Sequence, residues 1–180
     1  EKFSLAGRTA LVTGGAGLYG RQIVEALAEA GAEVYMASRN LEALEQAASS
    51  HRKAGRKVVA LQMDQGEEAS ILAARDILLE RSGRIDVLIN NAVLRPMKSY
   101  HDDAAAFARS MEVNATGLFM ITRAVGEVMQ AGGSIINVGS IQGMVGPDPT
   151  NYRGTDMNGF IPDYFFHKGG MINFTRFVAS

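Results

Sequence analysis

The chain has 180 residues, of which 47% are hydrophobic and 21% are charged, as in a globular domain with a sizeable core. Its formal net charge of -1 gives no electrostatic reason to expect nucleic acid or an acidic membrane as a partner. Because there is no cysteine, disulfides, thiolate catalysis and cysteine-ligated metals are excluded.

Short apolar runs alternate with amphipathic stretches along the whole chain. Residues 9–13 (TALVT) are too few and too rich in β-forming side chains for a helix, so they indicate a strand. Asn40, by contrast, is suited to cap the helix predicted to start at residue 41. In chain order, the pattern predicts a strand over 9–13, a helix over 21–30, a strand over 34–37, a helix over 41–54, a strand over 58–63, a helix over 69–81, a strand over 87–89, a long helix over 103–129, a strand over 134–138, an irregular stretch over 139–163 and a final helix from about residue 162.

This alternation predicts an α/β fold with a doubly wound parallel sheet and helices on both faces, as in Rossmann-like proteins. Right-handed crossovers in such a sheet place a ligand crevice at the carboxyl ends of the strands. We expect residues 1–180 to form a single dinucleotide-binding catalytic domain. No apolar run is long enough to cross a membrane and the first residues lack the layout of a signal peptide, so we expect a cytoplasmic protein.

A glycine-rich turn follows the first predicted strand, with Gly14, Gly17 and Gly20 in the spacing G-x-x-G-x-x-G. Glycine lets the backbone approach a pyrophosphate closely, and the N–H groups at the start of the next helix can then bind it. An ordinary strand–helix turn is the alternative, but the position before an amphipathic helix favours dinucleotide binding. Leu18 and Tyr19 lie inside this turn and are counted among the cofactor-binding residues.

The next two strand ends suggest which dinucleotide is bound. No carboxylate follows the second strand to hold the ribose hydroxyls of NAD; Ser38 and Arg39 stand there instead. The guanidinium of Arg39 suits the 2′-phosphate of NADP, which we therefore favour over NAD, while a solvated surface arginine is the alternative. After the third strand, Asp64, with Gln65 beside it, can accept a hydrogen bond from the adenine amino group, cap the following helix, or do both.

With further motifs included, the sequence resembles the short-chain dehydrogenase/reductase family over essentially its whole length. The residues that carry the resemblance are Thr13–Gly20, Asp64, Asn90-Asn91-Ala92, Asn114, Ser140 and the Tyr164-Phe165-Phe166-His167-Lys168 segment. The resemblance implies hydride transfer between a nicotinamide and a small alcohol or carbonyl substrate. It also implies a catalytic set of Asn114, Ser140, Tyr164 and Lys168, cofactor contacts from Asn91, Ala92 and Lys168, and a homo-oligomer (dimer or tetramer) in the full-length protein.

Elementary chemistry supports Tyr164 and Lys168 as the reacting pair. Residues four apart share one face of a helix, and a lysine ammonium near a tyrosine favours the phenolate that acid–base catalysis needs. Without the glycine turn, a tyrosine on a buried helix face with a snorkelling lysine would be the simpler interpretation. Tyr152 is a rival, but Asp156 stands four residues on, and a carboxylate there would disfavour the phenolate. Tyr152 is kept as a possible substrate contact.

Ser140 and Asn114 each have a functional and a structural interpretation. The Ser140 hydroxyl can orient the substrate oxygen and stabilise developing charge, or it can satisfy a local backbone group. Asn114 falls on the apolar stripe of the long helix, where a buried amide needs hydrogen-bond partners. It either binds a water that links Lys168 to solvent, as its counterpart in the family does, or makes a structural contact. The three histidines show no metal-ligand spacing and receive no chemistry, so no metal is expected.

Departures from the family pattern keep two other functions open. Gly14, Gly17 and Gly20 are spaced as in sugar-nucleotide epimerases and dehydratases, and Val93 replaces a usual glycine, which leaves room for a non-catalytic dinucleotide-binding protein. Family members continue beyond a helix like the one that carries Lys168. We therefore expect the C-terminal part of the fold, with the lid of the substrate pocket, to be missing from this chain.

Overall fold

The computed structural model describes residues 2–155 and 161–180, which divide into two compact units. The first, called the sheet unit, comprises Glu1–Ala92 and Gly117–Val138. The second, called the helical unit, comprises Val93–Thr116 and Gly139–Ser180. Each unit is described by itself.

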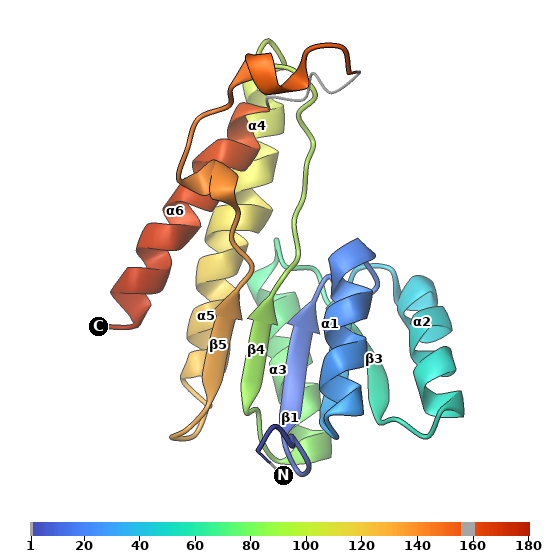
Figure 1. Ribbon diagram of the computed structural model, residues 1–180. Coiled ribbons are helices and arrows are strands. Elements are labelled where there is room, and N and C mark those ends of the chain that lie inside the picture. Colours follow the sequence, from blue (N-terminus) through green and yellow to red (C-terminus); the bar gives the residue numbers. More distant parts are fainter. Residues whose placement is uncertain (1, 156–160) are drawn as a thin grey trace. The chain divides into compact units, whose positions relative to one another are not determined.

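A parallel five-stranded sheet with the order β3-β2-β1-β4-β5 forms the sheet unit (Figure 1). The strands are β1 (Thr9–Thr13), β2 (Glu33–Ser38), β3 (Val58–Gln62), β4 (Val87–Asn90) and β5 (Ser134–Asn137). From β1 the chain adds strands in one direction to β3, and β4 and β5 then extend the sheet in the other direction. A reversal of this kind opens a crevice between the carboxyl ends of the two strands beside it, here β1 and β4. The predicted doubly wound α/β fold is confirmed.

Helices cover both faces of this sheet because alternate strand residues point to opposite sides. The helices are α1 (Leu18–Glu29), α2 (Leu41–Lys53), α3 (Glu68–Ser82) and α5 (Gly117–Gly126). Val12 of β1 belongs to one buried cluster with Val24 of α1 and Leu44 of α2. The neighbouring strand residue, Leu11, belongs to a second buried cluster with α3 and α5, which includes Ile121. Two separate apolar cores thus hold the sheet between two helical layers.

The helical unit carries the remaining elements. They are α4 (Ala104–Met111), the π-helical turn η1 (Glu112–Thr116), the 3₁₀ turns η2 (Ile141–Gly143) and η3 (Pro149–Tyr152), and α6 (Pro162–Val178). Asp103 caps α4, because its carboxylate accepts a hydrogen bond from the Ala105 backbone N–H at 3.1 Å. Helices α4 and α6 pack together through Phe107 and Phe166, whose rings lie edge to face with centroids 5.4 Å apart.

Two predicted helices have an end that differs from the observed one by more than one residue. Helix α1 begins at Leu18 rather than at residue 21, because the glycine turn closes at Gly17. The helix predicted over 103–129 is helical only from Ala104 to Gly126, and its middle turn is π-helical. A π turn inserts one extra residue, which an apolar stripe of three- and four-residue steps does not reveal. No described helix is both long enough and apolar enough to span a lipid bilayer.

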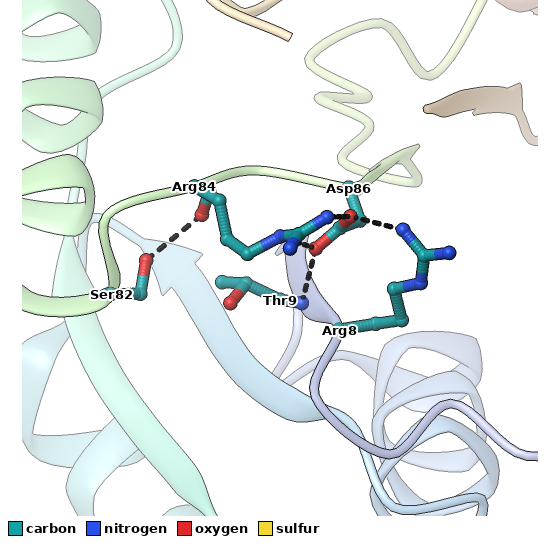
Figure 2. A network of polar contacts seen from close by, with 5 residues as sticks. All are labelled: Arg8, Thr9, Ser82, Arg84 and Asp86. Atoms are coloured by element: carbon teal, nitrogen blue, oxygen red, sulfur yellow. Dashed lines mark hydrogen bonds and ion pairs between the residues drawn. The ribbon is translucent and has the colours of Figure 1, made fainter. Parts of the chain in front are cut away.

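A network of charged side chains lies at the amino-terminal ends of β1 and β4 (Figure 2). The buried Asp86 carboxylate accepts hydrogen bonds from the guanidinium groups of Arg8 and Arg84, at 2.8 Å each, and from the Thr9 backbone N–H at 2.9 Å. Burial alone would raise the pKa of Asp86, but the bonds from Arg84, Thr9 and Arg8 outweigh it and lower this pKa from 3.8 to about 2. The ionised carboxylate therefore stabilises the fold.

We predict that Asp86→Asn lowers the free energy of unfolding by about 1–3 kcal/mol near neutral pH. Since the folded-state pKa is depressed, this contribution is present above the unfolded pKa of 3.8 and is lost as the pH falls towards 2. Urea unfolding of both proteins between about pH 6 and about pH 2 should show the difference shrinking. The exposed Asp76→Asn serves as control, and an equal loss in it, or a pH-independent gap, would contradict the prediction.

Candidate functional site

Close backbone packing shapes the glycine turn between β1 and α1. Gly14 has φ +65°, a conformation that side chains disfavour, and its N–H donates to the Ala37 carbonyl at 2.8 Å. A Cβ on Gly20 would lie 2.1 Å from the Gly14 carbonyl oxygen, far inside contact distance. Only glycine at position 20 therefore lets α1 start this close to the end of β1.

Thr13 and Asn91 fasten this turn to the end of β4. The Asn91 side-chain amide donates to the carbonyls of Thr13 and Gly14, at 3.0 and 3.2 Å. The Thr13 hydroxyl accepts in return from the backbone N–H groups of Asn91, at 3.1 Å, and Ala92, at 2.9 Å. Asn91 and Ala92, expected from the sequence to contact the cofactor, thus have a positional role, and any contact with the cofactor stays a prediction.

The amino terminus of α1 fits a dinucleotide phosphate. Its N-cap is Gly17, which has no side chain to occupy the first N–H groups, and no acidic residue stands in its first turn. Leu18 and Tyr19 follow with mostly exposed side chains. The first N–H groups of a helix have no partner within it, and the helix dipole favours negative charge beside them. The residues present therefore suit the group that the glycine spacing predicts.

The ends of β2 and β3 present the residues expected to hold the adenosine half. Ser38, Arg39 and Asn40 line an open hollow of about 430 Å³, and the Arg39 side chain is exposed there. Asp64 is half-buried, and one of its carboxylate oxygens accepts from the Gly66 backbone N–H at 2.9 Å. It therefore orders the turn before α3 and does not cap the first turn of that helix, whose N-cap is Glu67.

Gln65 lies beside α5 rather than at the protein surface. It is buried, and a Cβ on Gly117, the first residue of α5, would lie 2.3 Å from the Gln65 carbonyl oxygen. The glycine thus allows α5 to approach the segment that follows β3. Nothing in these contacts assigns Gln65 a ligand, and its expected cofactor contact stays a prediction.

Asn114, in the π-helical turn η1, binds the segment that begins the helical unit. Its side-chain oxygen accepts from the Leu94 backbone N–H at 2.9 Å, and its amide donates to the Leu94 carbonyl at 2.7 Å and to the Ser110 hydroxyl at 2.9 Å. These bonds satisfy the buried amide, as predicted for a polar group on this stripe. Asn114 thus makes the structural contact that was one of its two interpretations. The other interpretation, that Asn114 binds a water beside Lys168, stays a prediction.

Ser140 begins the turn η2, which packs directly on α6. Its hydroxyl accepts from the Gln142 backbone N–H at 3.2 Å, which leaves the hydroxyl proton to donate elsewhere. Three residues on, a Cβ at Gly143 would lie 2.6 Å from the backbone carbonyl of Lys168. The absence of a side chain at Gly143 therefore brings the Ser140 segment against the part of α6 that carries Lys168.

Helix α6 presents Tyr164 and Lys168 one turn apart, as their spacing predicts. The Lys168 ammonium lies 5.8 Å from the centroid of the Tyr164 ring, which is half-buried. Lys168 itself is 4% exposed. Burial, and then the positive charge of Arg95, lower the pKa of Lys168 from 10.5 to about 8. Lys168 thus remains charged near neutral pH but gives up a proton more readily than a surface lysine does.

Sequence reasoning missed His167, to which it assigned no chemistry. The ring is buried and lies edge to face with that of Tyr164, with centroids 5.3 Å apart. Burial and the charge of Lys168 lower the pKa of His167 to about 4, against the opposing effect of Asp163, so the imidazole is neutral at pH 7. The sequence spacing could have indicated the contact between His167 and Tyr164, because residues three apart are neighbours on the surface of a helix.

The rival tyrosine, Tyr152, ends the short turn η3 in the helical unit. Asp156, on which the argument against it depends, lies outside the described residues. Within residues 2–155 and 161–180, no cluster of three or more histidine, aspartate or glutamate side chains is arranged to hold a metal ion.

We predict that Gly20→Ala weakens dinucleotide binding by the full-length protein at least tenfold and lowers its stability by about 1–3 kcal/mol, because the new methyl group displaces the Gly14 carbonyl. The control is Gly170→Ala in α6, where a Cβ meets nothing within 4 Å and the change should be neutral or slightly stabilising. Thermal unfolding and fluorescence titration with NADPH measure both effects, and wild-type affinity in Gly20→Ala would refute this account of the turn.

Comparison with known proteins gives a consistent result. Residues 8–154 match the family model described as short chain dehydrogenase. The cyclopentanol dehydrogenase of a Comamonas species is 38% identical over 142 residues, which cover 77% of this chain and 57% of that protein. The chain thus spans little more than half the length of this relative.

Two solved structures resemble the chain closely. An NAD⁺-bound xylitol dehydrogenase has a TM-score of 0.87 and 31% identity, and the match covers 99% of this chain and 65% of that one. A gluconate 5-dehydrogenase from Burkholderia cenocepacia, in complex with NADP and tartrate, has a TM-score of 0.82 and 32% identity, with coverage of 96% and 65%. These three proteins are all dehydrogenases by name, which gives no support to an epimerase or a non-catalytic binder.

Proposed function

Because the chain belongs to the short-chain dehydrogenase/reductase family, we propose that the full-length protein is an NAD(P)-dependent alcohol dehydrogenase or carbonyl reductase. The main support from this chain is the pair on α6, the half-buried Tyr164 with the buried ammonium of Lys168 5.8 Å from its ring. The substrates are small alcohols and carbonyls. The named relatives act on a cyclic alcohol, a polyol and a sugar acid, which supports this class.

Tyr164 acts as the general acid and base. Oxidation of an alcohol removes a hydride from carbon and a proton from oxygen, and a bound nicotinamide dinucleotide supplies the hydride acceptor. The Tyr164 phenolate accepts the proton, and the phenol returns it to the carbonyl oxygen in the reverse direction. The Lys168 ammonium favours the phenolate through its positive charge. His167, neutral at pH 7, adds no positive charge of its own beside the ring.

Ser140 and Asn114 complete the set in different ways. The Ser140 hydroxyl, which accepts a hydrogen bond from the Gln142 backbone N–H, donates a hydrogen bond to the substrate oxygen and so orients it. Asn114 holds Leu94 through both of its amide atoms and thereby fixes the segment that leads to Arg95. Asn114 is thus a positioning residue in this scheme.

NADP is the preferred cofactor in this proposal, with NAD as the alternative. The glycine turn and the start of α1 hold the phosphates, and Arg39 in its open hollow holds the 2′-phosphate. Asp64 has one carboxylate oxygen engaged by Gly66, which leaves the other to accept from adenine. Relatives of both kinds exist, since one solved structure contains NAD⁺ and another contains NADP.

The assembly and the compartment belong to the same proposal. Family resemblance supports a homo-oligomer, dimer or tetramer, for the full-length protein. The cytoplasmic location stays the expectation drawn from the sequence. Light scattering of the purified full-length protein measures the oligomeric state. Imaging of a tagged protein in cells shows the compartment.

We predict that Tyr164→Phe lowers kcat at least about 10²-fold, because the proton acceptor is lost, while the affinity for NADPH stays close to that of the wild type. The matched control is Tyr100→Phe, a change at an exposed tyrosine of the same unit, which should keep most of the activity. Turnover of a panel of alcohols and ketones is followed by NADPH absorbance. Unchanged turnover in Tyr164→Phe, or an equal loss in Tyr100→Phe, would contradict the role of Tyr164 as the acid–base group.

We predict that Arg39→Ala weakens NADPH binding by at least about tenfold and leaves NADH binding nearly unchanged, because only NADPH carries the 2′-phosphate. Lys53→Ala, on the exposed end of α2, removes the same charge from the same unit and controls for long-range electrostatics. Fluorescence titration with each dinucleotide measures the ratio. Equal effects on the two cofactors would refute the phosphate contact.

A further inference from the structure

Arg95 lies directly over the proposed catalytic tyrosine. Its guanidinium carbon is 4.4 Å from the centroid of the Tyr164 ring, and both residues belong to the helical unit. The side chain is exposed, and no carboxylate in the described parts of the chain forms an ion pair with it. The proposed mechanism gives the N–H donors of this arginine no ligand.

Stacking on an aromatic ring prepares a guanidinium for binding an anion. The ring occupies one face of the guanidinium and limits its motion, while the N–H donors at its edge remain free. Those donors match the two oxygens of a carboxylate, with which arginine forms paired charge-assisted hydrogen bonds. A group held in place before the ligand arrives loses less conformational entropy on binding.

The charges around Tyr164 also favour an anion. Both Lys168 and Arg95 lie close to the Tyr164 ring. The positive charge of Arg95 contributes to the lowered pKa of both Lys168 and His167. Asp163 is the carboxylate that opposes this effect at His167, and it is completely buried and forms no ion pair among the described residues. An incoming carboxylate would relieve the repulsion between the two cations.

We propose, on the basis of the oxidoreductase function above, that Arg95 binds the carboxylate of the substrate, and that the preferred substrates are short hydroxy acids and the corresponding oxo acids. In this arrangement the carboxylate pairs with the guanidinium above the ring, and the hydroxyl or carbonyl of the same molecule meets the phenol oxygen of Tyr164. Arg95 is then a specificity-determining residue: its paired donors select the carboxylate, whereas Tyr164 performs the proton transfer.

The test compares three acids with neutral counterparts of similar shape: lactate with methyl lactate, glycerate with glycerol, and gluconate with sorbitol. The proteins are full-length wild type, Arg95→Gln, Arg95→Lys and the control Arg109→Gln. Arg109 is an arginine of the same unit whose charge is already paired with Glu112 at 2.6 Å. Calorimetric binding to the NADP-loaded protein is measured for every compound, and kcat/KM for every compound that turns over.

We expect the wild type to bind at least one acid more tightly than its neutral counterpart, and Arg95→Gln to reduce that preference by roughly 10-fold to 100-fold. Arg95→Lys should restore part of it, because the charge remains but the paired geometry is lost. Arg109→Gln should keep the wild-type preference. Binding of NADP itself should stay constant in all four proteins.

Other results would overturn the inference in distinguishable ways. Equal affinity for acids and neutral compounds, binding of none of the acids, or an equal loss for both classes in Arg95→Gln would reject carboxylate recognition. Loss of NADP affinity in Arg95→Gln would assign the guanidinium to a cofactor phosphate instead. If neutral alcohols turn over in a Tyr164-dependent manner, the proposed function stands even when the inference about Arg95 fails.

Discussion

The fastening of the glycine turn to the end of β4 is the constraint on which the functional end of the sheet unit depends. Thr13 and Asn91 exchange hydrogen bonds there between side chain and backbone in both directions. The resulting distances are so short that a Cβ on Gly14 would lie 3.0 Å from the Cα of Ala92. The direction in which α1 leaves the sheet, and therefore the direction of its free N–H groups, follows from this contact.

A comparable constraint organises the helical unit. Gly143 brings the backbone of η2 against that of α6 at Lys168, and the same short turn begins with Ser140. The position of the serine hydroxyl along α6 is thus set by a contact between backbones, which is more rigid than one between side chains. On the same helix, polar side chains are buried at positions 163, 167 and 168. Buried polar groups are costly, and a fold retains them most readily where they serve a function.

Asp86 and two exposed arginines, Arg39 and Arg95, represent two different uses of charge in this chain. Asp86 is surrounded by Arg8, Arg84 and a backbone N–H at the amino-terminal ends of the strands, and such a fully satisfied charge stabilises the fold. Arg39 and Arg95 are exposed and have no ion-pair partner in the described ranges. A guanidinium without an ion-pair partner in the protein adds little electrostatic stability, but it is available for a ligand oxyanion. Membership of a dehydrogenase family agrees with this division.

The local pattern of the sequence was sufficient for the fold class, because apolar runs, glycine stops and the Asn40 cap each act over a few residues. It was also sufficient to place Tyr164 and Lys168 on one face of a helix, since that needs only the helical repeat. Only the tertiary structure showed the backbone contacts of Asn91 and Asn114 and the stacking of Arg95 on Tyr164. Thr13 and Asn91 are 78 positions apart, and their contact depends on the pairing of β1 with β4. Contacts of this kind arise from the packing of whole elements, so no short stretch of sequence encodes them.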